Sequence, residues 1–71
     1  MVARKYNATT QRVLIYLLTR IEHDNRIRTF SQAYLAQKLE TSQPNISKAI
    51  KVLEKDKVIF KKDFDYYFNE F

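Results

Sequence analysis

The chain has 71 residues, with 13 lysines and arginines against 8 aspartates and glutamates, a net charge of +5. It has no cysteine, no glycine and one histidine, which excludes a disulfide framework, a glycine-rich phosphate loop and an ordinary zinc or triad site. No apolar run approaches the roughly 18 residues of a membrane span. We expect residues 1–71 to form a single domain of a cytoplasmic, intracellular protein that is not an enzyme and needs no cofactor. The excess of positive charge favours an anionic partner such as nucleic acid.

The first predicted element is a long helix. Residues 1–6 are predicted to form a flexible basic arm, and Asn7 is a suitable N-cap for a helix that extends to about residue 22 or 23. Four apolar residues inside it follow the i, i+3, i+4, i+7 spacing of one helix face: Leu14, Leu17, Leu18 and Ile21. This spacing predicts an amphipathic helix whose apolar face packs in the core.

Three further residues widen the apolar face of this helix: Val13, Ile15 and Tyr16. One explanation is a central helix that the other helices cover. The other is a second buried face at a contact between subunits. We favour the subunit contact, because a monomer of 71 residues has little core with which to cover seven large apolar side chains.

Residues 31–55 predict two short helices joined by a turn. Apolar residues recur at helical spacing on both sides of a polar break at residues 40–42: Leu35, Ala36 and Leu39 before it, and Ile46, Ala49, Ile50 and Leu53 after it. Ser31 and Ser42 are suitable N-caps, and Pro44 is tolerated in the first turn of the later helix. Two helices joined by so short a turn cross steeply, which is the geometry of a helix-turn-helix unit.

Two short β-prone runs follow, "VIFKK" at residues 58–62 and "YYFN" at residues 66–69. They flank an acidic segment at residues 63–65. Runs of this kind around a short polar break predict a hairpin, which we place at residues 57–69.

Residues 31–59 resemble the winged helix-turn-helix domain, in particular that of MarR-type and ArsR-type regulators and of certain plasmid replication initiators. The matching positions are Leu35-Ala36, Leu39, Ser42, Ile46-Ser47, Ile50 and Leu53, followed by Val58-Ile59. The resemblance implies the order helix, strand, helix, helix, strand, strand, in which residues 26–30 supply a short strand that pairs with the wing. The expected fold class is mainly α with a small β-hairpin, an α+β winged helix-turn-helix domain.

The chain departs from the family pattern at two turns. The family often has glycine there, where this chain has Glu40 and about Asp56-Lys57. A residue with a side chain adopts a positive φ at a cost of roughly 1 kcal/mol. We expect these turns to be slightly re-formed, not absent.

The predicted third helix has the arrangement that reading of DNA requires. The residues opposite its apolar stripe are Pro44, Lys48, Lys51 and Lys55. Gln43, Asn45 and Lys48 lie in the first turns, where amides pair with adenine and lysine pairs with guanine. Ser42, Ser47 and Lys51 are better placed for phosphates. Three lysines on one helix face are also typical of a plain solvated surface, and it is the helix-turn-helix pattern that favours DNA.

Three lysines also lie at the base of the proposed wing: Lys57, Lys61 and Lys62. In winged helices the wing touches the minor groove or flanking phosphates, which basic residues suit. Asp63 and Asp65 stand at its tip and would repel phosphate. We therefore expect DNA contacts from the base of the wing and not from its tip.

Six aromatic residues lie in the last twelve positions: Phe60, Phe64, Tyr66, Tyr67, Phe68 and Phe71. Aromatic rings interleaved with lysine can stack on single-stranded bases, but such density more often forms core and interface. Strand alternation sends Tyr66 and Phe68 to one face of the hairpin and Tyr67 to the other. The predicted dimer interface consists of Val13, Ile15, Tyr16, Tyr67 and Phe71.

These features predict a sequence-specific double-stranded DNA-binding protein, a small transcriptional regulator that acts as a homodimer on a palindromic site. A plasmid or viral replication-control protein is a close variant. Two other readings stay open: a winged-helix module for protein–protein interaction, and a protein that binds RNA or single strands through its aromatic residues. No small-molecule ligand and no membrane association are indicated.

Overall fold

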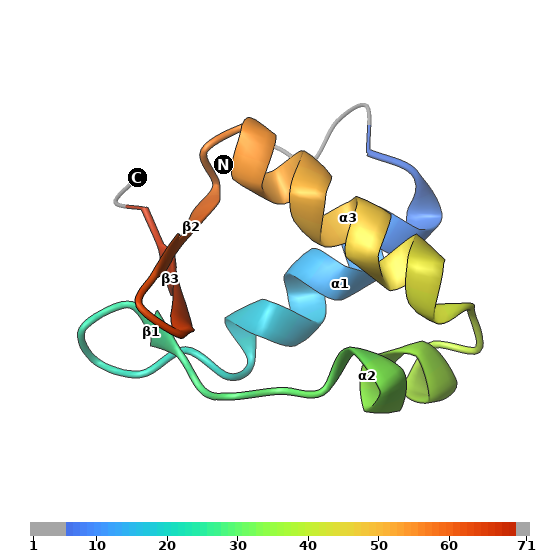
Figure 1. Cartoon of the computed structure of the whole chain (residues 1–71), viewed down its shortest axis with the longest axis horizontal. Helices are drawn as coiled ribbons and strands as arrows, with labels where there is room; N and C mark the ends of the chain where they lie inside the picture. The colour runs from blue at the N-terminus through green and yellow to red at the C-terminus, as the bar shows by residue number, and fades with distance from the viewer. Residues whose placement is uncertain (1–5, 70–71) are drawn as a thin grey trace.

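The computed structural model describes residues 6–69, which form three helices and one three-stranded antiparallel sheet (Figure 1). In chain order the elements are α1 (Ala8–Leu18), β1 (Arg26–Ile27), α2 (Gln32–Lys38), α3 (Gln43–Lys55), β2 (Ile59–Lys62) and β3 (Asp65–Phe68). The predicted α+β class is confirmed. Of the predicted basic arm at residues 1–6, only Tyr6 lies within the described residues, and its hydroxyl donates a hydrogen bond to Asp56 Oδ2 at 2.7 Å. No helix in this part of the chain is long and apolar enough to cross a membrane.

The three helices begin where the sequence predicts. The side chains of Asn7, Ser31 and Ser42 each accept a hydrogen bond from the backbone N–H three residues later. Pro44 lies in the first turn of α3, as predicted. Each cap satisfies one of the N–H groups that a first helical turn leaves without a helical partner.

Helix α1 ends earlier than predicted, at Leu18. Beyond it, Arg28 N donates a hydrogen bond to Arg20 O at 3.0 Å, and Ile21 forms a β-bridge with Ile27. The backbone after Leu18 therefore pairs with the segment around β1. This pairing takes the place of the last turn of the predicted helix.

The sheet has β3 in the middle, with β1 and β2 on either side. Both outer strands pair antiparallel with it. The short strand predicted within residues 26–30, and its pairing with the hairpin, are thus confirmed. Lys62 pairs with Asp65, so the turn of the hairpin consists of Asp63 and Phe64.

Helices α2 and α3 both end in a turn that in other proteins often contains glycine. Here Glu40 (φ 56°) and Lys57 (φ 62°) adopt the left-handed conformation. At the end of α3, Val58 N donates to Leu53 O at 2.9 Å and Lys57 N donates to Glu54 O at 3.0 Å. The end of α2 has the same pair of bonds around Glu40. Both turns follow the Schellman pattern, so they are present, as expected, and a residue with a side chain carries the positive φ in each.

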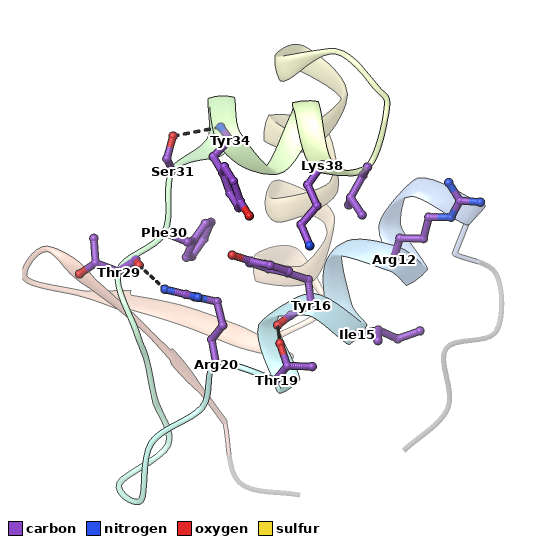
Figure 2. Close-up of a pocket in the computed structure, with 11 residues that line it drawn as sticks. Arg12, Ile15, Tyr16, Thr19, Arg20, Thr29, Phe30, Ser31, Tyr34 and Lys38 are labelled. Carbon is purple, nitrogen blue, oxygen red and sulfur yellow. Dashed lines mark hydrogen bonds between the residues drawn. The ribbon is translucent and has the colours of Figure 1, made fainter.

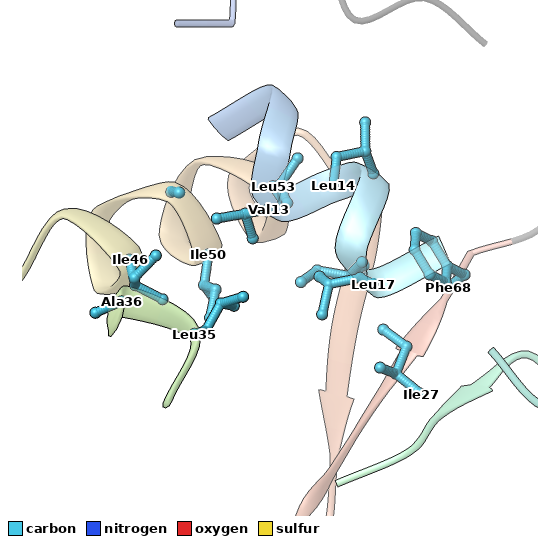
Figure 3. Packing of buried hydrophobic residues seen from close by; sticks show 12 residues of the cluster. Val13, Leu14, Leu17, Ile27, Leu35, Ala36, Ile46, Ile50, Leu53 and Phe68 are labelled. Atoms are coloured by element: carbon cyan, nitrogen blue, oxygen red, sulfur yellow. The ribbon is translucent and has the colours of Figure 1, made fainter. Parts of the chain in front are cut away.

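The core is continuous from the helices to the sheet (Figure 3). Its buried apolar residues are Val13, Leu14, Leu17, Ile27, Leu35, Ala36, Ile46, Ala49, Ile50, Leu53, Ile59 and Phe68. Helix α3 packs against both α1 and α2. Val13 is 0% exposed, which corrects its predicted place in a dimer interface. Because α3 packs across α1, the central-helix explanation holds for this residue.

Candidate nucleic-acid interface

Helix α3 separates its apolar and polar side chains onto opposite faces. The residues of the apolar stripe are buried: Ile46, Ala49, Ile50 and Leu53. Of the residues predicted to bind DNA on this helix, Ser47 is half-buried, and the exposed ones are Gln43, Pro44, Asn45, Lys48, Lys51 and Lys55. The separation follows from the helical period of 3.6 residues. The solvent face of α3 therefore presents three ammonium groups, and two exposed amides flank it on either side in the first turn.

The N-terminal end of α3 adds the hydroxyl group of its capping residue to this face. Ser42 is exposed, and its Oγ accepts a hydrogen bond from Asn45 N at 3.3 Å. The cap uses a lone pair of the hydroxyl and does not consume its hydrogen. Ser42 is thus placed to cap the helix and to donate to a phosphate at the positive end of the helix dipole.

The side chain of Asn45 is oriented by a neighbour that sequence analysis missed. Its Nδ2 atom donates a hydrogen bond to Thr41 Oγ1 at 2.9 Å. The amide has two hydrogens, so this bond leaves one hydrogen and the carbonyl oxygen for the edge of a base. A threonine four residues before an asparagine is a weak signal by itself, because only the turn between α2 and α3 brings the two side chains together.

Two further polar residues border the α3 face. Gln32, at the start of α2, lines a hollow of about 390 Å³ together with Gln43. Thr9, near the start of α1, lines a second hollow of about 240 Å³ together with Lys48. Neither residue stands out in the sequence, since their proximity to α3 depends on how the helices cross. They extend the candidate interface onto α1 and α2.

The lysines predicted at the base of the wing do not form one patch. Lys61 and Lys62 are both exposed, and they lie on opposite faces of the sheet because neighbouring residues of a strand alternate. Lys61 Nζ lies 5.7 Å from the ring centroid of Tyr66. Burial raises the pKa of the Tyr66 hydroxyl, and the negative charge of Glu54 acts in the same direction. Because Lys61 and Lys62 lie on opposite faces of the sheet, a DNA duplex that approaches from one side can contact only one of them directly.

The tip of the hairpin has one carboxylate in an ion pair and one in solvent. Arg26 Nε lies 3.4 Å from Asp65 Oδ2, and Arg26 Nη1 lies 2.6 Å from Glu22 Oε1. The hydrogen bond and charge of Asp65, with a smaller influence from Glu22, raise the pKa of Arg26. Asp63 is exposed, and Phe64 beside it is 93% exposed. An aromatic ring next to a carboxylate is unsuited to a phosphate contact.

The aromatic residues of the hairpin divide between the two faces of the sheet. Phe68 lies in the core, and Tyr66 packs against the core with its ring centroid 6.0 Å from that of Phe30. Phe60 and Tyr67 stack on the other face, with centroids 5.5 Å apart. The predicted separation of Tyr66 and Phe68 from Tyr67 is confirmed.

The remaining residues predicted for a dimer interface lie on two elements. Ile15, on α1, is 61% exposed, and Tyr16 beside it is half-buried. Tyr67 lies on the outer face of the sheet, half-buried by its stacking on Phe60. Phe71 lies outside the described residues. Surface that a partner can reach is thus present on α1 and on the sheet.

A scan against protein-family models finds no match for the chain, and searches of curated proteins and of solved structures find no similar protein. Within residues 6–69, no group of three or more His, Cys, Asp or Glu side chains is placed to hold a metal ion.

Proposed function

We propose that the chain is a winged helix-turn-helix protein that binds double-stranded DNA in a sequence-specific manner and acts as a small transcriptional regulator without a cofactor. The observation that carries this proposal is the solvent face of α3, where three lysines lie opposite a buried stripe and two exposed amides flank them in the first turn. The sheet order β1-β3-β2, with a hairpin after α3, supports the winged arrangement.

In the proposed complex the first turns of α3 enter the major groove. Gln43, Asn45 and Lys48 then face the base edges, which amides and lysine can distinguish by their donors and acceptors. Ser42 and Lys51, together with the N-terminal end of the helix, contact phosphates on either side. The positive charge of the chain supports association with the polyanion.

A plasmid or viral replication-control protein would use the same interface, since it too has to recognise a duplex site. One recognition helix covers few base pairs, so we propose a homodimer on a palindromic site. The proposed contacts of α3 with DNA are the same for a transcriptional regulator and for a replication-control protein.

Selection of bound duplexes from a random pool tests the proposal. A clear consensus is expected, and a palindromic consensus with half-sites about one helical turn apart supports the dimer. Titration with the selected duplex and with each of its single strands is the matched comparison. Equal affinity for duplex and single strand, or a pool without enrichment, would contradict duplex recognition by α3.

A second candidate function is protein–protein interaction. The exposed ring of Phe64 favours it, because a large apolar side chain fully in solvent at the tip of a hairpin is typical of a contact residue. This function is compatible with DNA binding, since the tip and the solvent face of α3 use different residues.

A further inference from the structure

A groove between α1, α2 and the segment that precedes α2 combines aromatic rings with positive charges (Figure 2). Its volume is about 750 Å³. Its aromatic and cationic residues are Tyr16, Phe30, Tyr34, Arg12, Arg20 and Lys38. None of the described residues that line it is acidic. We call it the α1–α2 groove.

Tyr16, Tyr34 and Arg20 surround the middle of the α1–α2 groove (Figure 2). The hydroxyl ends of Tyr16 and Tyr34 both point toward its middle (Figure 2). The guanidinium of Arg20 donates a hydrogen bond to Thr29 O at 3.0 Å and lies 5.5 Å from the ring centroid of Tyr16. Arg20 Nε is buried and has no hydrogen-bond partner among the described residues. An occupant that matches this groove combines an aromatic ring, which packs on the tyrosine rings, with an anion that the hydroxyls and the cations can bind.

The hairpin tip of the same chain has this complementary chemistry. Phe64 is 93% exposed and stands between Asp63 and Asp65 in the sequence. Asp65 is engaged by Arg26, whereas Asp63 is exposed to solvent. The tip thus presents one ring and one accessible carboxylate, and Phe64 does not line the α1–α2 groove of its own chain.

We propose that the α1–α2 groove binds the hairpin tip of a second copy of this chain, with Phe64 between the rings of Tyr16 and Tyr34. The carboxylate of Asp63 then lies near the ammonium of Lys38, whose side chain extends toward the same part of the groove (Figure 2). Burial of the ring against aromatic side chains supplies the apolar contribution, and the opposite charges fix the orientation.

The position of the tip relative to the groove favours a symmetric pair. Thr29 and Phe30 line both the α1–α2 groove and a smaller hollow that Phe64 borders. Tip and groove are therefore neighbours on each copy. A two-fold axis lets each copy insert its tip into the groove of the other, which gives a closed dimer. This inference rests on the homodimer of the proposed function, and it does not depend on DNA binding.

Analytical ultracentrifugation of the full chain over a micromolar concentration range tests the docking. The variants are Phe64→Ser and Tyr34→Ser, each of which removes one half of the contact from an exposed position. Phe60→Ser is the matched control, since it removes a partly exposed ring from the same hairpin away from the tip. We expect a concentration-dependent dimer for the wild type and the control, and about a tenfold or greater weakening for each of the two variants. A wild type that stays monomeric, or an equal loss in the control, overturns the proposal.

A double-mutant cycle tests the orientation of the docked tip. Asp63→Asn, which suits the positive φ of this turn residue (58°), and Lys38→Gln are each expected to weaken the dimer, and the chain with both changes is expected to lose little more affinity than either single variant, because each change removes the same pair. Circular dichroism confirms that each variant is folded. Two losses that add in full overturn the pairing of Asp63 with Lys38.

The two proposals fail in different ways. Lys48→Ala is expected to weaken duplex binding without changing the sedimentation of the free protein. A monomeric wild type that binds its duplex with full affinity removes the docking proposal alone. A dimer that depends on Phe64 but binds no duplex removes the DNA proposal alone.

Discussion

The side-chain amide of Asn45 donates a hydrogen bond to the hydroxyl oxygen of Thr41, one helical turn earlier, at 2.9 Å. The bond crosses from the solvent face of α3 to the turn that joins it to α2. It restricts the amide to an orientation in which one hydrogen and the oxygen remain for a ligand. An amide oriented before binding loses less conformational entropy when it pairs with a base.

Asn45→Ala is expected to change sequence preference more than overall affinity. The lost amide distinguishes adenine from other bases by roughly 1–3 kcal/mol. Thr41→Val, which removes the acceptor that orients the amide, should reduce the same discrimination by a smaller amount. The measurement compares affinities for the selected duplex and for duplexes changed at one base pair. A uniform loss of affinity over all sequences would show that Asn45 contacts the DNA backbone and not a base.

Lys48→Ala and Lys51→Ala are each expected to weaken duplex binding and to lower the slope of log affinity against log salt by about one unit. Both lysines are exposed opposite the buried stripe, so the domain should stay folded. Arg28→Gln is the matched control: it removes the same charge from an exposed side chain that follows β1 and belongs neither to α3 nor to the hairpin. If the control lowers the slope as much as the variants do, the effect belongs to net charge and not to α3.

Glu40→Gly and Lys57→Gly are each expected to raise the free energy of unfolding by about 0.5–1 kcal/mol. Both residues have a positive φ, which costs a residue with a Cβ more than it costs glycine, and this outweighs the greater freedom that glycine has in the unfolded chain. Asn25 also has a positive φ (67°), but asparagine tolerates it, so Asn25→Gly should change stability little. Urea unfolding measures all three. Destabilisation by both of the first two changes would contradict the assigned strain.

Val13→Lys is expected to unfold the domain, whereas Ile15→Lys should leave it folded. Val13 is 0% exposed, and Ile15, two positions later on the same helix, is 61% exposed. Burial of an ammonium group without a partner costs several kcal/mol, which is comparable with the whole stability of a domain of this size. Far-ultraviolet circular dichroism during thermal unfolding distinguishes the two. A folded Val13→Lys variant would show that the face around this residue opens to solvent.

Local sequence signals predicted the parts of the fold that depend on a few neighbouring residues. The N-caps Ser31 and Ser42 depend on one side chain and the N–H three residues later, and the buried stripe of α3 depends only on helical period. The positive φ of Glu40 and Lys57 follows from the turn geometry that ends each helix. These signals need no knowledge of distant contacts.

The parts that the sequence did not predict depend on residues far apart in the chain. Helix α1 ends at Leu18 because Ile21 pairs with Ile27, a contact that apolar spacing cannot reveal. Val13 was assigned to a subunit contact because the sequence does not show that α3 packs across α1. The α1–α2 groove was missed for the same reason, since its walls come from two helices and the segment that joins β1 to α2.

The ion pairs that join Glu22, Arg26 and Asp65 connect the turn after α1 to the base of the hairpin tip. Such pairs near a surface weaken as dissolved ions screen them, over a length of about 10 Å at 0.1 M salt. The hairpin is therefore a part of the protein whose own rigidity responds to ionic strength. A salt titration of DNA affinity consequently reports two processes, release of ions from the phosphates and loosening of the hairpin. Asp65→Asn, which removes the carboxylate charge and with it the salt-dependent part of the pairing with Arg26, separates the second process from the first.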